Sequence, residues 1–415
     1  MIRLKEMKIL HICMGNSLDF QGGITNYVRS LSMEQSKHGY DVYVLADDGT
    51  ENEYKVIKLK SKIKKWDINK YKDKYQYDFI NNLLKEYKFD IIHLHMILTL
   101  DFRTLELLKN YNYIVSLHDY SFICPRVQMV RPGEIRCEKK SEKCYMCFSL
   151  LEKSFFLAKV FKHLFPKYNI CRFPIKSKKL IMKYLNDSKN MLENAKMLLP
   201  VSNRVMEIYK NSDIQNNYKV LHIGNDTSNY FNDNNDKKIV KKEEINFVIL
   251  SAFNEKKGSE LICRIIKSIN NKNIKFHFWG YATKKQINKM KIFGIEYHGS
   301  YLQNDLKQIL SEMDFGVACP IWEDNAPQIV MEMLNNKIPV FATKMGGIPD
   351  FINEKNGFIF DPFNENDINS AIEFLNNLNL KKINILRNNI TKTITPLEHY
   401  YDVINVYKEI LKIKK

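Results

Sequence analysis

The strongest constraint on the fold is a repeated alternation of short apolar runs with segments long enough to be helices. In the first half of the chain the apolar runs span residues 8–14, 41–46, 89–96, 113–117 and 196–201. Short, continuously apolar runs are typical of parallel strands that are covered on both faces. The pattern predicts an open sheet with crossover helices and a ligand site at the carboxyl ends of its strands.

One crossover helix is marked clearly, between the first two of these runs. Residues 24–38 place Tyr27, Val28 and Leu31 among polar side chains, as in an amphipathic helix. Gly39 follows at a position suited to ending that helix. The segment completes a strand, helix and strand unit.

The second half of the chain repeats the alternation after an interruption. Residues 225–244 are rich in Asn, Asp and Lys and predict a domain junction. New apolar runs then span 245–250, 275–279, 295–298, 315–318 and 339–342. We therefore expect two Rossmann-like doubly wound domains, 1–224 and 225–395. A broad apolar face at 400–413 predicts a terminal helix that returns to the first domain, so that 396–415 completes it.

Net charge and cysteine content limit the binding partners and the cellular location that we expect. The formal net charge is +17, which permits attraction to nucleic acid, anionic lipid or phosphorylated substrates. No known nucleic-acid-binding motif is present, and we expect no nucleic-acid partner. The eight cysteines follow no signal peptide, and no run reaches the ~20 apolar residues of a membrane span. These features predict a cytoplasmic protein, soluble or peripheral at the inner membrane face.

The most informative segment spans residues 320–333. Asp324 lies at a predicted strand-to-helix turn and Glu332 two turns into the helix, so one carboxylate could meet a sugar and the other a ribose. The N–H groups from Ala326 to Ile329 would occupy the first helical turn, where unpaired amides favour a diphosphate. The sequence predicts donor contacts here from Ala326, Pro327, Gln328, Ile329 and Glu332.

A glycine pair, Gly22 and Gly23, follows the first predicted strand and opens the first predicted helix. Glycines at such a place let the backbone approach a phosphate or a sugar. Taken alone, the pair is equally consistent with a structural turn.

The segment from Asp324 to Glu332 resembles the Glu-x7-Glu motif of family-4 retaining glycosyltransferases, with Asp324 in place of the first glutamate. The resemblance extends over nearly the whole chain. It includes Gly22-Gly23-Ile24, the His-bearing run Phe89-Asp-Ile-Ile-His-Leu-His95, Val201-Ser202 and Lys257-Gly258.

This resemblance implies a GT-B fold and sugar transfer, with retention, from a nucleoside diphosphate sugar to a glycan or lipid-linked acceptor. No cofactor or catalytic metal is implied. Lys257, helped by Lys256, would bind the diphosphate, and His118 would reach the donor sugar. The expected donor contacts also include Gly22, Gly23 and Gly280. An arginine common in the family is replaced here by Ala252.

Four cysteines, Cys124, Cys137, Cys144 and Cys147, fall in one short stretch. The Cys-x2-Cys spacing at its end is typical of zinc ligands, and four thiolates would make a closed, structural site. The alternative is a set of reduced or partly paired cysteines that hold an irregular loop.

Basic and aromatic residues interleave between residues 151 and 190. Such a segment suits an interfacial helix on anionic lipid, near a lipid-linked acceptor. A helical insertion whose aromatic side chains face the core would explain it equally well.

Other functions stay open at this level. A catalytically weak sugar-nucleotide-binding module would explain the missing arginine, and a GT-B epimerase would share the architecture. Cell-surface polysaccharide or glycolipid synthesis is the setting that the family resemblance implies.

Overall fold

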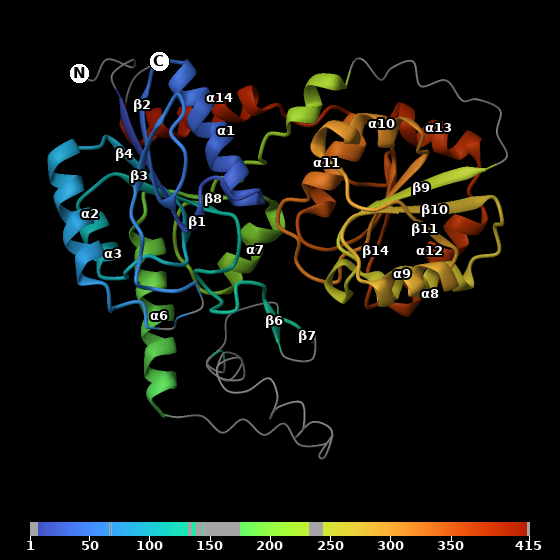
Figure 1. Cartoon of the computed structure of the whole chain (residues 1–415), viewed down its shortest axis with the longest axis horizontal. Coiled ribbons are helices and arrows are strands. Elements are labelled where there is room, and N and C mark those ends of the chain that lie inside the picture. Colours follow the sequence, from blue (N-terminus) through green and yellow to red (C-terminus); the bar gives the residue numbers. More distant parts are fainter. Residues whose placement is uncertain are drawn as a thin grey trace. The chain divides into compact units, whose positions relative to one another are not determined.

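The computed structural model describes residues 7–65, 67, 69–131, 135–137, 144, 175–231 and 244–412. The chain divides into two compact units. Unit 1 combines Met1–His222 with Pro396–Lys415, and unit 2 is Ile223–Thr395. Each unit is built around its own parallel sheet (Figure 1).

The sheet of unit 1 has six parallel strands in the order β3-β2-β1-β4-β5-β8. Chain order reverses between the neighbours β1 and β4, and in doubly wound sheets ligands bind at the carboxyl ends of the strands at such a reversal. The strands are β1 (Lys8–Ser17), β2 (Asp41–Asp48), β3 (Lys55–Lys58), β4 (Ile91–Ile97), β5 (Tyr113–Leu117) and β8 (Leu198–Pro200).

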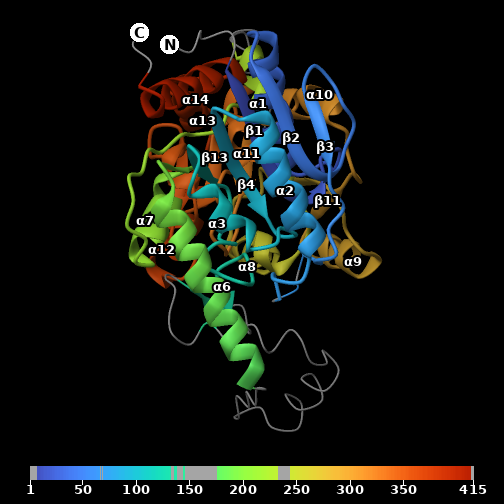
Figure 2. The same cartoon turned by 90° about the vertical axis from the view of Figure 1, so that its left-hand side faces the viewer.

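Helices pack with this sheet, and one of them, α14 (Pro396–Ile410), comes from the C-terminal end of the chain. In both views α1 and α14 lie side by side (Figures 1 and 2). On α14, Val403, Ile404, Val406 and Tyr407 are buried, which is why the terminal helix belongs to unit 1. The helices are α1 (Gly23–Lys37), α2 (Lys74–Tyr87), α3 (Thr104–Leu108), α6 (Ile175–Asn194), α7 (Asn203–Asn211) and α14 (Pro396–Ile410). A short antiparallel pair joins β6 (Val130–Arg131) to β7 (Ile135–Arg136).

Unit 2 repeats the same topology, with the strand order β11-β10-β9-β12-β13-β14. The reversal now falls between β9 and β12. The strands are β9 (Ile245–Leu250), β10 (Ile274–Trp279), β11 (Ile295–Tyr297), β12 (Phe315–Ala318), β13 (Val340–Thr343) and β14 (Gly357–Phe360). The helices are α8 (Ser259–Ser268), α9 (Lys284–Ile292), α10 (Leu306–Ser311), α11 (Gln328–Asn335), α12 (Glu365–Asn376) and α13 (Leu380–Asn388).

The core of unit 2 has two layers, one on each face of the sheet. Phe247 and Ile249 of β9 pack with residues of α8 and α12, whereas Val248 and Leu250 pack with residues of α10 and α11. Because alternate side chains point to opposite faces, a strand covered on both sides is apolar at every position.

The expected α/β class with two doubly wound sheets is confirmed, and each apolar run forms a strand. Two strands of the parallel sheets, β3 and β14, and the short pair of β6 and β7 were not predicted. β3 and β14 each lie at the edge of a parallel sheet. Part of the stretch that was predicted as a domain junction has secondary structure. Residues 226–230 form a 3₁₀ turn that packs on α11, with Asn335 Nδ2 3.1 Å from Thr227 Oγ1.

No helix in the described part of the chain is long and apolar enough to cross a membrane. Most of the basic and aromatic segment at 151–190 lies outside the described residues.

Candidate active site

The candidate site in unit 2 is built on the two loops that leave β9 and β12. After β9, the turn Glu255–Lys257 is capped by Asn254, whose side chain accepts a hydrogen bond from the Lys257 N–H at 3.0 Å. Gly258 then adopts φ 79°, and a Cβ there would lie 1.8 Å from the Cys319 carbonyl oxygen. The turn therefore requires glycine in order to lie against the end of β12.

Lys257 and Asp324 meet at this point. The Nζ atom of Lys257 lies 2.7 Å from Oδ2 of Asp324 and 5.6 Å from the centre of the Trp322 ring. Their side chains are 34% and 21% exposed, so solvent still reaches the pair. A cation at the switch point of a doubly wound sheet is well placed for an anionic ligand.

Three residues that the sequence did not single out as site residues, Glu323, Gly346 and Gly347, hold the Asp324 loop in place. The buried Glu323 carboxylate accepts a hydrogen bond from the Gly346 N–H at 2.9 Å, and the Gly347 N–H donates to the Asp324 carbonyl at 2.7 Å. Gly346 has φ 55°, and a Cβ there would lie 2.0 Å from the Asp324 carbonyl oxygen. The glycine pair after β13 was the available signal, because glycines there allow this close approach.

Helix α11 begins later than the sequence predicted. Its N-cap is Pro327, and Gln328 is its first residue. Ala326 and Pro327 therefore precede the helix, and proline has no N–H to donate. Of the predicted run, only the amides of Gln328 and Ile329 belong to the first turn, where the helix dipole favours negative charge.

Glu332, the second predicted carboxylate, is buried in the second turn of α11. Burial raises the pKa of this carboxyl group above its usual value, with a hydrogen bond from Gln303 opposing the rise and the Asp226 charge adding to it. Gln303 Nε2 lies 3.2 Å from Glu332 Oε1. The site thus contains a carboxylate that is costly to keep charged.

Two buried donors beside α11 have no hydrogen-bond partner among the described residues. They are the Trp322 indole Nε1 and the Gln328 amide Nε2. The oxygen of the same Gln328 amide does have a partner, because Oε1 accepts a hydrogen bond from Asn225 Nδ2 at 2.8 Å. Buried donors are normally satisfied, so these two atoms are candidates for contact with a polar ligand.

The remaining predicted donor contacts of unit 2 lie close to these loops. The Lys256 carbonyl accepts a hydrogen bond from the Ile321 N–H at 2.9 Å, which ties the two loops together. Gly280 directly follows β10, and its N–H donates to the Gly299 carbonyl at 2.8 Å.

In unit 1, the predicted residues lie at the carboxyl ends of the central strands. Gly22 is the N-cap of α1 and Gly23 its first residue, with open space where a Cβ on Gly23 would point. His118 follows β5, and its ring packs edge-on against Tyr27 at 4.5 Å between centroids. Burial, with a smaller effect of His399, lowers the pKa of His118 to about 3, so the imidazole is neutral at physiological pH.

Three of the four predicted zinc ligands are described, and Cys147 lies outside the described residues. Cys137 is buried, and Cys124 and Cys144 are partly exposed. Burial raises the pKa of the Cys124 thiol to about 12, with the neighbouring Cys144 and Cys137 thiols adding to the rise. A thiol in this setting stays protonated unless a cation binds beside it.

Zinc at this loop therefore stays a prediction with a direct measurement. Elemental analysis of the purified protein should find about one zinc per chain, because a four-cysteine site binds one ion. Cys124→Ser should lose the metal, whereas Cys263→Ser, a buried cysteine on α8, should keep it. Metal-free wild-type protein with unchanged stability would favour the reduced-cysteine alternative.

Comparisons with known proteins identify the family. Residues 244–377 match the family described as glycosyl transferases group 1, and residues 21–145 match the glycosyltransferase family 4. The chain is a family-4 glycosyltransferase. The first match contains Lys257, Asp324 and Glu332, and the second contains Gly22 and His118. No curated protein matches the sequence.

The glycosyltransferase has the GT-B fold of several solved structures. A sucrose-phosphate synthase of Thermosynechococcus elongatus aligns with TM-score 0.65 and 13% identity, over 98% of this chain and 100% of its own. A glycosyltransferase of Rickettsia africae gives 0.61 and 15%, over 99% and 100%. Anabaena HepE, solved with UDP, gives 0.60 and 12%, over 97% and 100%.

Proposed function

We propose that this glycosyltransferase moves a sugar, with retention of anomeric configuration, from a nucleoside diphosphate sugar to a glycan or lipid-linked acceptor. Unit 2 would bind the donor and unit 1 the acceptor. The observation that carries the proposal is the ion pair between Lys257 and Asp324 at the point where strand order reverses.

The diphosphate is assigned to Lys257 and to the first turn of α11. As the glycosidic C–O bond breaks, negative charge grows on the leaving diphosphate. A lysine ammonium and the amides of Gln328 and Ile329 would stabilise that charge more strongly in the transition state than in the ground state. On donor binding, Lys257 would exchange part of its contact with Asp324 for phosphate oxygens.

The two carboxylates receive different roles. Asp324 would orient the sugar next to the diphosphate, and Glu332 would accept hydrogen bonds from ribose hydroxyls. Because burial disfavours the Glu332 charge, hydroxyl donors from a ligand would stabilise the ionised form. His118 would contact an outer hydroxyl of the sugar. Anabaena HepE, whose fold is similar, has been solved with UDP-glucose, which supports a nucleotide-sugar donor.

We place the reaction in the synthesis of cell-surface polysaccharide or glycolipid, in the cytoplasm or at the inner face of the membrane. The basic and aromatic residues between 151 and 190 support attraction to anionic lipid, where a lipid-linked acceptor would reside.

A thermal-shift panel of nucleoside diphosphates and nucleotide sugars tests donor binding. A ligand present at about a hundred times its dissociation constant stabilises the folded state by ~2.7 kcal/mol. We expect the diphosphate with the correct base to raise the melting temperature, and its sugar conjugate to raise it further. A panel in which no nucleotide raises it would contradict the proposal.

Retention of anomeric configuration is tested on the product that the enzyme makes from the nucleotide sugar identified in this panel. Nuclear magnetic resonance of the fresh product should show the anomeric configuration of the donor. An inverted product would remove retention from the proposal and leave glycosyl transfer intact. Conversion of the donor to another sugar nucleotide without acceptor would instead indicate an epimerase.

A further inference from the structure

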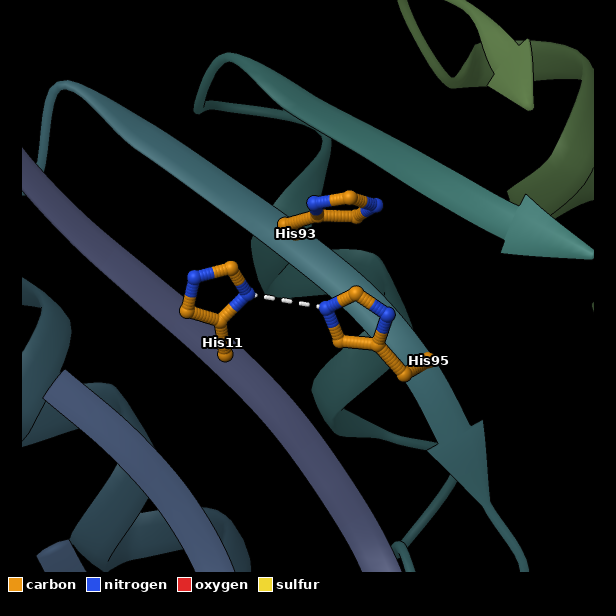
Figure 3. Close-up of side chains that lie close together, drawn as sticks. All are labelled: His11, His93 and His95. Atoms are coloured by element: carbon orange, nitrogen blue, oxygen red, sulfur yellow. Dashed lines mark hydrogen bonds between the residues drawn. The ribbon is translucent and has the colours of Figure 1, made fainter. Parts of the chain in front are cut away.

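Two groups of described side chains each bring three metal-ligating atoms within 4.8 Å of one another. The first group is buried in unit 1 and consists of His11, His93 and His95 (Figure 3). His11 Nδ1 lies 2.8 Å from His95 Nε2, the contact dashed in Figure 3. The other ring nitrogens pair with Gln35, Tyr407, Ser116 and His118. An ion would have to break several of these contacts, so we assign no metal to this group.

The second group lies in unit 2, on the edge strand β11 and its neighbour β10. His277 of β10 is paired in register with Glu296 of β11, and His298 follows two positions after Glu296. The His298 N–H donates to the Phe278 carbonyl at 2.9 Å, so the pairing of the two chain segments continues as far as His298. Because alternate residues of a strand point to the same face, all three side chains lie on one face of the sheet.

The three ligand atoms are spaced as the ligands of one ion would be. His277 Nδ1 lies 3.1 Å from His298 Nε2 and 3.5 Å from Glu296 Oε2. The Glu296 oxygen and the His298 nitrogen are 4.0 Å apart. Zinc–nitrogen bonds of about 2.0–2.1 Å place tetrahedral ligand atoms about 3.3–3.4 Å from one another. The Glu296 side chain is 61% exposed, so it has room to rotate and close the longest of the three distances.

The side chain of Asn246 on β9 orients the His277 ring. Asn246 Nδ2 donates to the main-chain carbonyl of Glu312 at 3.5 Å, so the amide oxygen faces His277. That oxygen lies 3.4 Å from His277 Nε2 and only accepts, so the Nε2 atom carries the proton. His277 Nδ1 is then left with a lone pair directed at His298 and Glu296. A second-shell carbonyl or amide oxygen of this kind is a regular feature of histidines that bind metals.

The His298 ring is held by a stacking contact. It lies against the Trp279 indole with 4.2 Å between ring centroids and 13° between ring planes. Trp279 follows His277 by two positions on β10, so the same strand supplies one ligand and the support for another. Both imidazoles are thus positioned before any ion binds, which lowers the cost of ordering the site.

The charge around the group favours a cation. Among the described residues, the ion-pair partners of Glu296 are the two histidines, and no lysine or arginine pairs with it. Two ring nitrogens 3.1 Å apart cannot both carry a proton, so at least one of these rings is neutral. Glu244 and Glu312 also act on the charge of His277, although Lys275 pairs with Glu244 at 3.8 Å.

The group is also open to solvent, unlike the buried histidines of unit 1. The side chains of His298 and Glu296 are 35% and 61% exposed, and that of His277 is 14% exposed. An ion can therefore enter from water and keep water in its remaining coordination positions. Two imidazoles and one carboxylate suit zinc and its neighbours in the first transition row better than calcium or magnesium.

We propose that His277 Nδ1, His298 Nε2 and the Glu296 carboxylate bind one divalent transition ion of the zinc class, which clips the edge strand β11 to β10. The ion would supply the positive charge that Glu296 lacks, and water would complete its coordination. The inference goes beyond the proposed function and does not depend on it. In the sheet, β10 and β11 lie on the opposite side of β9 from β12, whose loop carries Asp324.

A hydrogen bond without an ion is the competing interpretation. The His298 Nε2–H would then donate to the His277 Nδ1 lone pair, and Glu296 would stay hydrated. The two interpretations differ in one measurable property, which is the binding of an added ion.

Titration with Co²⁺ tests the site, because this ion takes zinc-type coordination and is coloured. The whole chain is used as isolated, so that any zinc in the cysteine loop stays in place. We expect one Co²⁺ per chain, with visible ligand-field bands, and displacement of this ion by Zn²⁺. Because the ligands are imidazole and carboxylate, the near-ultraviolet charge-transfer band of a cobalt–thiolate bond should be absent. No uptake by the wild type, or a spectrum with the thiolate band alone, would overturn the proposal.

Glu296→Gln and His298→Ala should each abolish this cobalt spectrum. Both positions are exposed, so neither change removes a core contact. Glu354→Gln and His38→Ala are the matched controls, also at exposed positions, and should bind Co²⁺ as the wild type does. Uptake that survives unchanged in Glu296→Gln and His298→Ala would place the ion elsewhere in the protein and contradict the assignment.

Asn246→Ala tests the orientation of His277. Loss of a second-shell partner typically weakens metal binding by about 10–100-fold, and we expect a loss in that range. The shape of the cobalt spectrum should be unchanged, because the three ligands remain. An affinity equal to that of the wild type would remove Asn246 as a positioning residue.

Hydrogen exchange tests the clip itself. Saturating Zn²⁺ should slow exchange of the amides at residues 295–299 in the wild type, because the ion joins the edge strand to its neighbour. The same amides should exchange at one rate with and without Zn²⁺ in Glu296→Gln. Zinc binding without added protection of these amides in the wild type would contradict the clip. All of these measurements are made without donor or acceptor, so their failure is distinguishable from failure of the proposed function.

Discussion

Lys257→Ala should lower kcat/KM for the donor by about 10²–10³-fold, the usual cost of losing one group that stabilises transition-state charge. The loop after β9 places the Lys257 ammonium against Asp324. The arginine that is common in the family a few residues earlier is replaced here by Ala252. Lys256 is the one other side-chain cation that we assign to the diphosphate. Steady-state kinetics of donor consumption with acceptor present would measure the loss.

Stability should change little in the same variant. The ion pair is partly exposed, and exposed pairs contribute about 0–1 kcal/mol to the free energy of unfolding. Lys267→Ala, an exposed lysine in the last turn of α8, is the matched control and should keep full activity. Wild-type kinetics in Lys257→Ala would remove Lys257 from the reaction and, with it, the central observation behind the proposed function.

Glu332→Gln should raise the donor KM by about one to two orders of magnitude. A hydrogen bond to a charged group contributes about 1.5–3 kcal/mol, and the isosteric amide keeps the shape of the side chain while losing the charge. The variant should also bind the free nucleoside diphosphate more weakly than the wild type does, since the proposed partner of Glu332 is the ribose. Calorimetric titration of the variant with the diphosphate would measure it. An unchanged affinity for the diphosphate would assign Glu332 to another role.

The same substitution should leave the free protein as stable as the wild type, or make it more stable, at neutral pH. Burial raises the pKa of Glu332 in the folded state, so the folded protein holds this proton more tightly than the unfolded chain. The wild-type carboxyl group makes its full contribution to the free energy of unfolding below the pKa that it has in the unfolded chain. That contribution is lost as the pH rises through the higher pKa of the folded protein.

The stability difference between Glu332→Gln and the wild type should therefore grow in favour of glutamine over that pH window and then stay constant. Denaturant unfolding at a series of pH values would follow it. Asp305→Asn, a change in the exposed turn next to Gln303, is the matched control and should show no such trend. A variant that is less stable than the wild type at neutral pH would mean that the carboxylate stabilises the free protein.

Local sequence was sufficient for the strands of the two parallel sheets, except β3 and β14, and for their order along the chain. The run 113–117 is a strand over the predicted residues, and all five of its residues are buried, as is typical of a parallel strand covered on both faces. The start of α11 was misplaced by two residues. Pro327 can begin a helix or precede one, and the sequence around it does not decide between the two.

The sequence by itself determined that this chain has two doubly wound sheets, that it resembles family-4 glycosyltransferases, and that Lys257, Asp324, Glu332 and His118 are the residues to examine. These conclusions depend on patterns and spacings within short segments, which local propensity and burial control.

Only the tertiary structure decided which of these side chains meet and in what state. Lys257 and Asp324 are 67 positions apart, and Gln35 and Tyr407 are 372 apart. Strand order brings the first pair together, and the docking of α14 on unit 1 brings the second. These contacts join side chains from different elements of the fold, and no local pattern specifies such contacts.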